Sequence, residues 1–185
     1  MQAYFYNKDQ PYDGTQLRSR WIENSFGISG DAIAAFCGEA DVPIEHMVDL
    51  EDVAANKPIY SESMLHFIIE QFHQDLEKMV FNQRLFIAIL SEELKKFSQC
   101  RNILRKGNDL YDGAAKLSVS IATRSPVSCL IHTGINISRK NTPVLTKGLE
   151  DYDINPKTFA ENAMARYALE LEEIAHAQRK VRSVA

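Results

Sequence analysis

Residues 103–137 read ILRKGNDLYDGAAKLSVSIATRSPVSCLIHTGINI, and this stretch decides the fold. The Asp112-Gly113 pair is a strong signal for a tight turn between two antiparallel strands. The apolar runs 117–123 and 128–137 predict two further strands, which the Ser125-Pro126 pair separates. Links this short join antiparallel neighbours, because parallel strands require a long crossover connection. The middle of the chain is therefore predicted to form an antiparallel sheet.

Two helices are predicted on either side of this region. Residues 83–97 carry apolar side chains at helical spacing, with charged residues on the opposite side. The last helix has Asn155 as its cap and Pro156 at its first position, a combination typical of helix starts. Its expected buried positions are Ala160, Met164, Tyr167, Leu171 and Ile174.

The first part of the chain gives weaker signals. Residues 3–6 predict a short strand, and the apolar runs 32–37 and 65–72 are interpreted as two more. Thr15 is a candidate cap for a helix. The side chains expected on the buried side of that helix are Leu17, Trp21 and Ile22.

The composition is that of one globular domain. The 185 residues are 45% hydrophobic and 25% charged, so residues 1–185 can bury a substantial core. With the patterns above, this predicts an α+β fold with a mainly antiparallel central sheet flanked by helices. A formal net charge of -4 offers no basic surface for nucleic acid. No apolar run approaches the roughly 20 residues that span a bilayer, and a signal-peptide pattern is missing.

The chain has three cysteines, which lie far apart in the sequence: Cys37, Cys100 and Cys129. We therefore expect neither a disulfide framework nor a paired-cysteine metal site. Unpaired cysteines fit a reducing compartment, so we expect a cytoplasmic protein, and one with no membrane partner. Glu70 and His73 have the Glu-x-x-His spacing of helical di-metal sites, but such sites need two pairs. We therefore expect no dedicated metal site.

Three short elements of residues 83–137 occur in an order that resembles the core of biotin protein ligases. Asn108-Asp109 matches the end of that family's Lys-Trp-Pro-Asn-Asp element. Lys116-Leu117 matches its catalytic lysine segment, and Gly134-Ile135-Asn136 matches the end of its Gly-Ile-Gly-Ile-Asn element. The resemblance implies the fold of biotin and lipoate ligases and class II aminoacyl-tRNA synthetases. The pattern, including YDGTQLRSRW at residues 12–21, is also similar to a prokaryotic family known only as a domain of unknown function.

The resemblance implies an enzyme that ligates or transfers a small carboxylic acid. Lys116 would be the catalytic residue, because a lysine on a rigid strand can stabilise negative charge that develops between two anions. ATP and magnesium would form the adenylate of the acid, and an acyl-carrier protein could accept the acyl group; a homo-oligomer is compatible with this scheme. The positions implied to bind substrate or nucleotide are Arg105, Asn108, Asp109, His132, Gly134 and Asn136, and Arg18 and Arg20 are candidates for an anion clamp.

Several positions depart from the biotin ligase pattern. The family's Gly-Arg-rich adenylate loop corresponds to residues 49–63, which contain no glycine or arginine and a single cation, Lys57. Arg105 replaces a family lysine. Val119 replaces a glycine, and its side chain would crowd a bound ligand. ATP-driven ligation in its usual form is therefore not the only function to consider.

Two alternatives stay open. Octanoyl transferases of the same superfamily need no adenylate loop and pair a similar lysine with a nucleophilic cysteine, and residues 132–136 also resemble their His-Gly element. Their cysteine follows that strand, however, whereas the last cysteine here is Cys129, which we expect to be a buried core thiol. The other alternative is a member that binds a ligand or partner without chemistry, in which Lys116 faces solvent and Asn108-Asp109 caps a turn.

Overall fold

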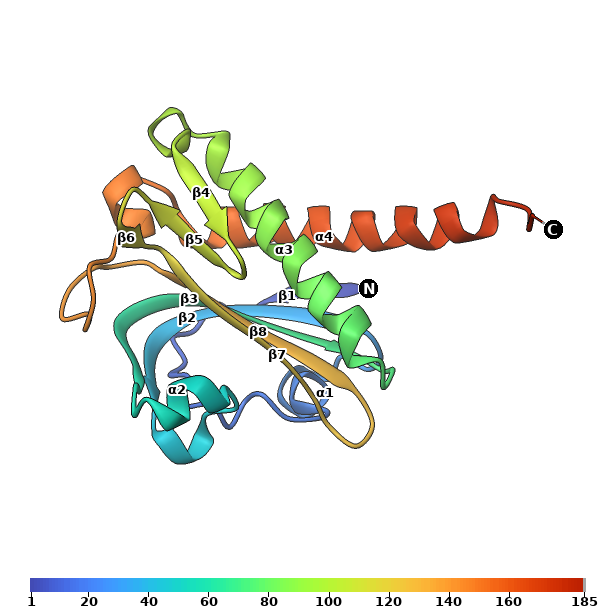
Figure 1. Ribbon diagram of the computed structural model, residues 1–185, viewed down its shortest axis with the longest axis horizontal. Coiled ribbons are helices and arrows are strands. Elements are labelled where there is room, and N and C mark those ends of the chain that lie inside the picture. The colour runs from blue at the N-terminus through green and yellow to red at the C-terminus, as the bar shows by residue number, and fades with distance from the viewer. Residues whose placement is uncertain (185) are drawn as a thin grey trace.

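A computed structural model describes residues 1–184, whose central element is a five-stranded sheet with the strand order β1-β2-β3-β8-β7 (Figure 1). β1 runs parallel to β2, and each of the other neighbours is antiparallel. The mainly antiparallel sheet and the pairing of the strands around Ser125-Pro126 are confirmed. The strands are β1 Gln2–Phe5, β2 Ala32–Val42, β3 Ile59–Gln71, β7 Ser118–Arg124 and β8 Cys129–Asn136.

A smaller sheet stands at the edge of the large one. It contains β4 (Ile103–Lys106), β5 (Asp109–Asp112) and β6 (Ala115–Lys116), in that order. Asp112 pairs with Ala115 across a two-residue turn, as the Asp-Gly signal predicts. The Leu117 amide donates to the carbonyl of Leu110 at 2.8 Å, which fixes the hairpin against the start of β7.

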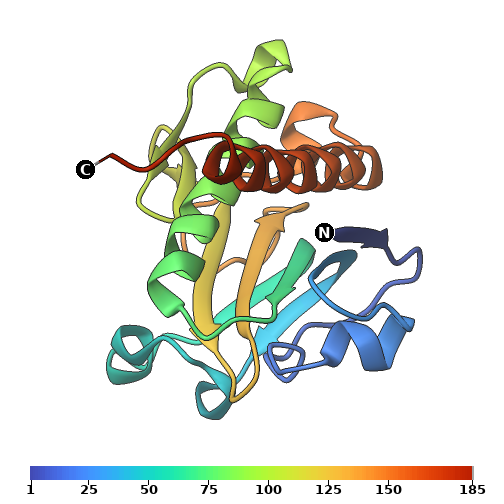
Figure 2. The ribbon, with the colours of Figure 1, turned by 90° about the vertical axis from the view of Figure 1, so that its right-hand side faces the viewer.

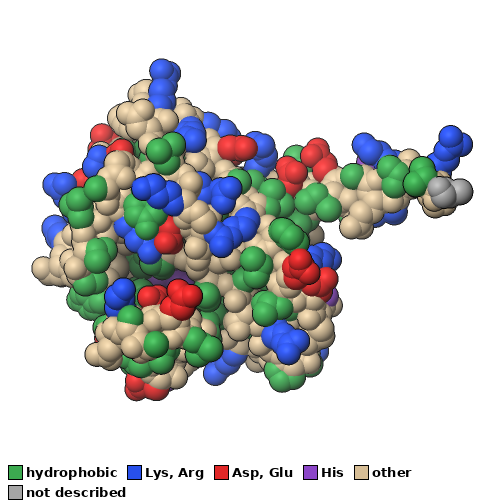
Figure 3. All heavy atoms as spheres, in the orientation of Figure 1, with side chains coloured by type: hydrophobic (Ala, Val, Ile, Leu, Met, Phe, Trp, Pro, Cys, Tyr) green, Lys and Arg blue, Asp and Glu red, His purple; other side chains and the backbone are tan. Residues whose placement is uncertain are grey.

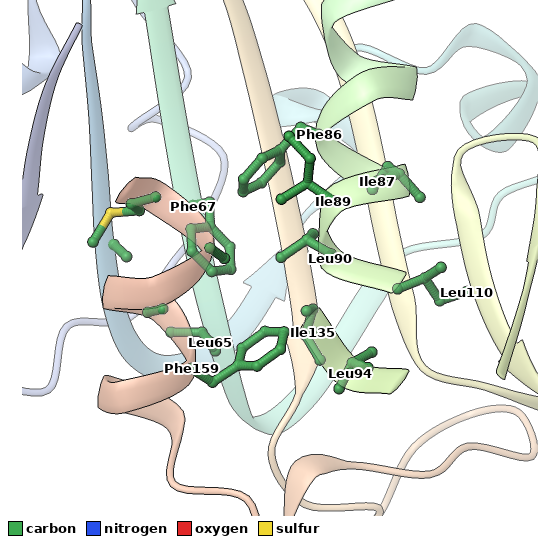
Figure 4. Close-up of a cluster of buried hydrophobic side chains, with 14 of the residues drawn as sticks. Leu65, Phe67, Phe86, Ile87, Ile89, Leu90, Leu94, Leu110, Ile135 and Phe159 are labelled. Carbon is green, nitrogen blue, oxygen red and sulfur yellow. The ribbon is translucent and has the colours of Figure 1, made fainter. Parts of the chain in front are cut away.

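Two long helices, α3 (Leu76–Lys95) and α4 (Pro156–Arg179), cover one face of the large sheet (Figure 2). Side chains from both helices meet alternate residues of β3 in a dry core (Figure 4). The Phe86 ring of α3 contacts the rings of Phe67 and Tyr167 edge-on, with centroids 5.1 and 5.0 Å away. Burial of each such large side chain contributes roughly 1.5–3 kcal/mol.

The helix boundaries correct two expectations. α3 begins seven residues before the predicted start because Asp75 accepts a hydrogen bond from the Lys78 amide at 2.9 Å and caps it. The exposed Phe81 hides this turn from a search for amphipathic spacing. α4 begins at Pro156 as predicted, but it extends beyond the rest of the molecule (Figure 1), and Ile174 is 38% exposed instead of buried.

The predicted helix start at Thr15 is wrong. The Thr15 hydroxyl and amide both bond to the Asp13 carboxylate, which forms a local turn. The helix α1 (Trp21–Phe26) begins six residues later, after Arg20, whose backbone has a left-handed φ of 59°. The buried Glu70 carboxylate accepts two hydrogen bonds from the Arg20 amide, at 2.8 and 3.0 Å, and holds this start in position.

The second face of the sheet is covered by α1 and by the segment that precedes it (Figure 2), whereas the short helix α2 (Leu50–Ala54) has no fully buried residue. This segment crosses β2 directly above Gly38, where a Cβ atom would lie 1.9 Å from the carbonyl oxygen of Gln10. Only glycine permits this crossing, and the crossing brings Tyr12 onto the sheet. Within residues 1–184, no helix combines the length and the apolar composition that crossing a bilayer requires.

Candidate functional site

Lys116, at the end of β6, has a backbone that is fixed from both sides. Its amide donates to the carbonyl of Leu145 at 3.0 Å, and its carbonyl accepts from the Lys147 amide at 3.2 Å. Its Nζ lies 2.8 Å from Oδ2 of Asp109, with 30% of the lysine side chain and 18% of the aspartate side chain exposed. The structure thus brings together two of the residues singled out in the sequence.

Two cavities meet at this ion pair. The first has a volume of about 260 Å³ and extends towards Tyr12 and His132, whereas the second, of about 470 Å³, extends towards Asn136. Figure 3 shows the surface hollowed between α2 and the β5–β6 hairpin, with a histidine visible inside it. The residues that line both cavities are Asp52, Ile59, Lys116 and Val119.

A pair of buried histidines lies beneath the first cavity. His66 on β3 is directly opposite Gly134 on β8, so His132, two residues earlier, is its diagonal neighbour on the same face. The Nδ1 atom of His66 lies 3.1 Å from Nε2 of His132, and Nε2 of His66 lies 3.3 Å from the carbonyl oxygen of Gly38. The Tyr12 ring stacks on His132 with a centroid separation of 3.8 Å.

Both histidines are uncharged at neutral pH. Burial lowers the pKa of His66 to about 4, although its hydrogen bond to the Gly38 carbonyl acts in the opposite direction. Burial, together with the neighbouring His66, holds the pKa of His132 well below its ordinary value of 6.5. The first cavity therefore has a neutral imidazole at its base, not a cation.

Acidic side chains line the first cavity more heavily than basic ones. Asp49, Asp52 and Asp109 all border it, and within residues 1–184 Lys116 is its one lysine or arginine. Asp49 caps α2 by accepting hydrogen bonds from the amides of residues 51 and 52. Burial raises the pKa of Asp109, against the opposing effect of its hydrogen bond to Lys116. A short acidic helix thus lies within residues 49–63, the stretch that is expected to correspond to the biotin ligase Gly-Arg loop.

The second cavity contains Asn136 at the end of β8. Its side-chain Nδ2 donates to the carbonyls of Lys116 at 3.3 Å and Lys147 at 3.4 Å, so this amide positions the lysine backbone. A Cβ atom at Gly134 would lie 2.8 Å from the terminal methyl of Met64. The space above Gly134 is therefore filled by the side chains of Met64 and Val119.

Asn108 also belongs to the first cavity, but Arg105 does not line either one. The Asn108 side chain donates to the carbonyl of Ser120 on β7 and faces the same hollow as Lys116. Arg105 is exposed and donates to the carbonyl of Gly107 at 2.7 Å, two residues along its own turn. The expectation that Arg105 contacts substrate is therefore not supported by its position.

The expected anion clamp is not formed by the two arginines near α1. Arg18 is exposed and lines neither cavity. The guanidinium of Arg20 lies 2.5 Å from Glu23 Oε2 and over the Phe72 ring, 5.4 Å from its centroid. These contacts give Arg20 a structural role at the start of α1.

The cysteines offer no activated thiol. Cys129 is fully buried, borders neither cavity, and has a pKa raised by burial. Burial raises the pKa of the half-buried Cys37 to about 11. The described residues, 1–184, contain no group of three or more histidine, cysteine, aspartate or glutamate side chains arranged to hold a metal ion.

Three contributors to the site were not found from the sequence: Tyr12, His66 and Asp52. His66 meets His132 only through the pairing of β3 with β8, which joins residues 66 positions apart. Tyr12 could have been noticed, because it is the first residue of the stretch YDGTQLRSRW, which resembles a family pattern. No local pattern marks Asp52.

A model of one protein family matches nearly the whole chain. The family is described as a domain of unknown function (DUF366), and the match covers residues 1–182. The chain belongs to this family. Uncharacterized protein MJ0805 from Methanocaldococcus jannaschii is 35% identical over 188 residues, which cover 97% of this chain and 84% of that protein. A solved structure of a protein of unknown function from Pyrococcus horikoshi has a TM-score of 0.93 at 37% identity and covers 100% of both chains.

Ligases share the fold of this DUF366 protein at much lower identity. Biotin protein ligase from Aquifex aeolicus, solved with biotin and ATP, has a TM-score of 0.62 at 14% identity, over 93% of this chain and 71% of that one. The T. acidophilum protein Ta0514, solved with lipoic acid, has a TM-score of 0.60 at 14% identity, over 92% and 85%. The predicted α+β fold of biotin and lipoate ligases is thereby confirmed.

Proposed function

We propose that this DUF366 protein binds a small carboxylic acid, or its adenylate, at Lys116 and acts as a divergent acyl-cofactor ligase or transferase. The observation that carries the proposal is the position of Lys116 at the junction of two cavities, on a backbone held from both sides. Lys116 is one of four residues that line both cavities, so an extended ligand that occupies both would lie next to this ammonium group. The fold neighbours solved with biotin or lipoic acid support the same ligand class.

Asp109 supports a carboxylate site, because it already pairs Lys116 with a carboxylate at 2.8 Å. A substrate carboxylate would take the place of Asp109 at Nζ. Since burial raises the pKa of Asp109, this group takes up a proton more readily than an ordinary aspartate when it loses the lysine. Lys116 would then stabilise the negative charge that develops at the reacting carboxyl group.

ATP and magnesium, which the resemblance implies, fit these residues poorly. The lysines of the second cavity are Lys57 and Lys116, and no arginine lines it within residues 1–184. Residues 49–63 lack the arginines and glycines that would surround a triphosphate. We therefore derive no step through ATP and propose a preformed adenylate as the activated substrate. A carrier protein is the proposed acceptor of the acyl group.

A second candidate function is ligand binding without chemistry. It is favoured by residues 49–63, which contain no glycine or arginine to hold the phosphate group of a reacting adenylate. In this case the same ligands would bind, but no acyl group would be transferred to an acceptor.

The experiment is a thermal-shift screen of purified protein with ATP-magnesium, biotin, lipoate, octanoate and their adenylates. A ligand that binds only the folded state raises the melting temperature. We expect a shift with at least one acid or adenylate, its loss in Lys116→Ala, and its retention in Lys147→Ala. Lys147 is the matched control, because its Nζ also pairs with an aspartate, Asp112, at 2.6 Å and its side chain lines neither cavity. The absence of any shift would contradict the proposal.

A further inference from the structure

The second half of α4 is an arm that leaves the body of the molecule. α4 packs against β1, β2 and α3, and its last buried residue is Tyr167. The arm, residues 168–182, extends past the other elements, and its helical part, 168–179, is about 18 Å long (Figure 1). None of its residues is buried. Since most helices in proteins are stabilised by packing of an apolar face, the arm lacks its main stabilising contact within residues 1–184.

The apolar stripe of α4 continues into the arm. The buried residues Ala160, Met164 and Tyr167 are followed by Leu171 and Ile174 at the same alternating spacing of four and three residues. This seven-residue repeat is typical of helices that pack lengthwise on one another. Leu171 is half-buried, and Ile174 is 38% exposed. The arm therefore presents an apolar face that residues 1–184 do not cover.

The charged side chains of the arm are sorted along its length. Acidic residues lie nearest the body and basic residues lie at the tip (Figure 3), in the order Glu170, Glu172, Glu173, Arg179, Lys180 and Arg182. Among the salt bridges of residues 1–184, none involves any of these side chains. A second arm that runs antiparallel would bring the acidic half of each copy against the basic half of the other, whereas a parallel arm would bring like charges together.

We propose that two copies of this chain form a symmetric dimer through antiparallel packing of their arms. A twofold axis relates the two copies, so every contact occurs twice. The register follows from the charges, because it places Glu173 of each copy level with Arg179 of the other. The same register places Leu171 level with Val181, which is 68% exposed, so the apolar and the charged positions are satisfied together.

The position of the arm permits this packing. Each arm is attached to its body at residue 168, so antiparallel packing places the two bodies at opposite ends of the helix pair, where they do not collide. The arm lines neither of the two cavities that meet at Lys116. Dimer formation and ligand binding can therefore be measured independently.

The test is sedimentation equilibrium of the full chain over a series of concentrations. We expect a dimer, and we expect Ile174→Glu to weaken it at least about tenfold, because the substitution places a carboxylate in the apolar contact. Leu169→Glu is the matched control, since Leu169 is 52% exposed and lies about 200° around the helix from Leu171. It should dimerise like the unaltered protein. A monomer at every concentration up to about 100 μM, or equal dimerisation in Ile174→Glu, would overturn the proposal.

Charge reversal tests the antiparallel register. Glu173→Lys and Arg179→Glu should each weaken the dimer by about tenfold, because each places like charges opposite one another twice in the symmetric interface. The two substitutions in one chain should restore the dimer. A double variant that dissociates as readily as the single variants would contradict the register. Both positions are exposed, so the variants should keep the fold, and circular dichroism checks this.

Discussion

Lowering the pH from 7 to 5 should destabilise the protein through its buried histidines. Since the pKa of His66 falls from its ordinary 6.5 to about 4 on folding, the unfolded chain binds more protons between these values. The stability that this group contributes is complete above about pH 6.5 and is lost as the pH falls towards 4. At pH 5 the loss from His66 is about 2 kcal/mol, because one pKa unit corresponds to about 1.4 kcal/mol. His132, whose pKa is also lowered, adds a loss in the same direction.

The assay is urea unfolding at pH 7, 6 and 5, and the free energy of unfolding is determined at each pH. His66→Phe is the informative variant, because a phenyl ring can replace the imidazole between Tyr12 and Phe36, whose centroids both lie 5.1 Å away. We expect its free energy of unfolding to fall by about 2 kcal/mol less than that of the unaltered protein between pH 7 and pH 5. His176→Gln, on the exposed end of α4, is the control and should behave like the unaltered protein.

An equal free energy of unfolding at pH 7 and pH 5 would refute this reasoning. It would mean that His66 and His132 bind protons equally well in the folded and the unfolded chain. The first cavity would then not have a neutral imidazole at its base, because that description depends on the lowered pKa values of both rings.

Three further predictions concern single residues. Asp109→Asn should free Lys116, so a titration should find tighter binding of a carboxylic acid. The variant should also gain stability relative to the unaltered protein as the pH rises above about 4, because the raised pKa of Asp109 makes its ionised form unfavourable in the folded state. Glu70→Ala removes a buried acceptor of the Arg20 amide and the Ser128 hydroxyl, so calorimetry should find a loss of about 3 kcal/mol, equivalent to roughly 6–12 °C in melting temperature. Leu90→Ala, in the core of Figure 4, should cost about 2–5 kcal/mol in chemical unfolding, and a change below about 1 kcal/mol would contradict the packing described.

The antiparallel neighbours in the middle of the chain could be predicted because their signals are local. An Asp-Gly turn and short apolar runs separated by Ser125-Pro126 restrict the chain to antiparallel neighbours, and the β7–β8 pairing follows from them. The predicted helix start at Thr15 was wrong because one local and one distant contact decide where the helix begins. Asp13 competes for the Thr15 hydroxyl and amide and forms a turn, and the α1 start depends on Glu70, fifty residues away.

The site was predictable only where motif spacing marked it. Lys116 and Asp109 could be selected as separate positions, but their ion pair depends on the register of the small sheet. The contact of His66 with His132 requires the register of β3 against β8, and a shift of one residue would move one ring to the other face. Arg20 was selected because arginines commonly bind anions, but its own neighbours, Glu23 and Phe72, use that charge.

The position of the acid at Lys116 can be tested most directly by calorimetric titration with non-hydrolysable sulfamoyl analogues of acyl adenylates. One analogue should carry a cyclic urea at the end of its acyl chain, and the other should carry an octanoyl chain. The unaltered protein should bind at least one of them, and Lys147→Ala should bind it equally well. Lys116→Ala should bind it at least about tenfold more weakly, since a hydrogen bond to a charged group contributes about 1.5–3 kcal/mol. Equal affinity in the unaltered protein and Lys116→Ala would contradict a site for the activated carboxyl group at this lysine.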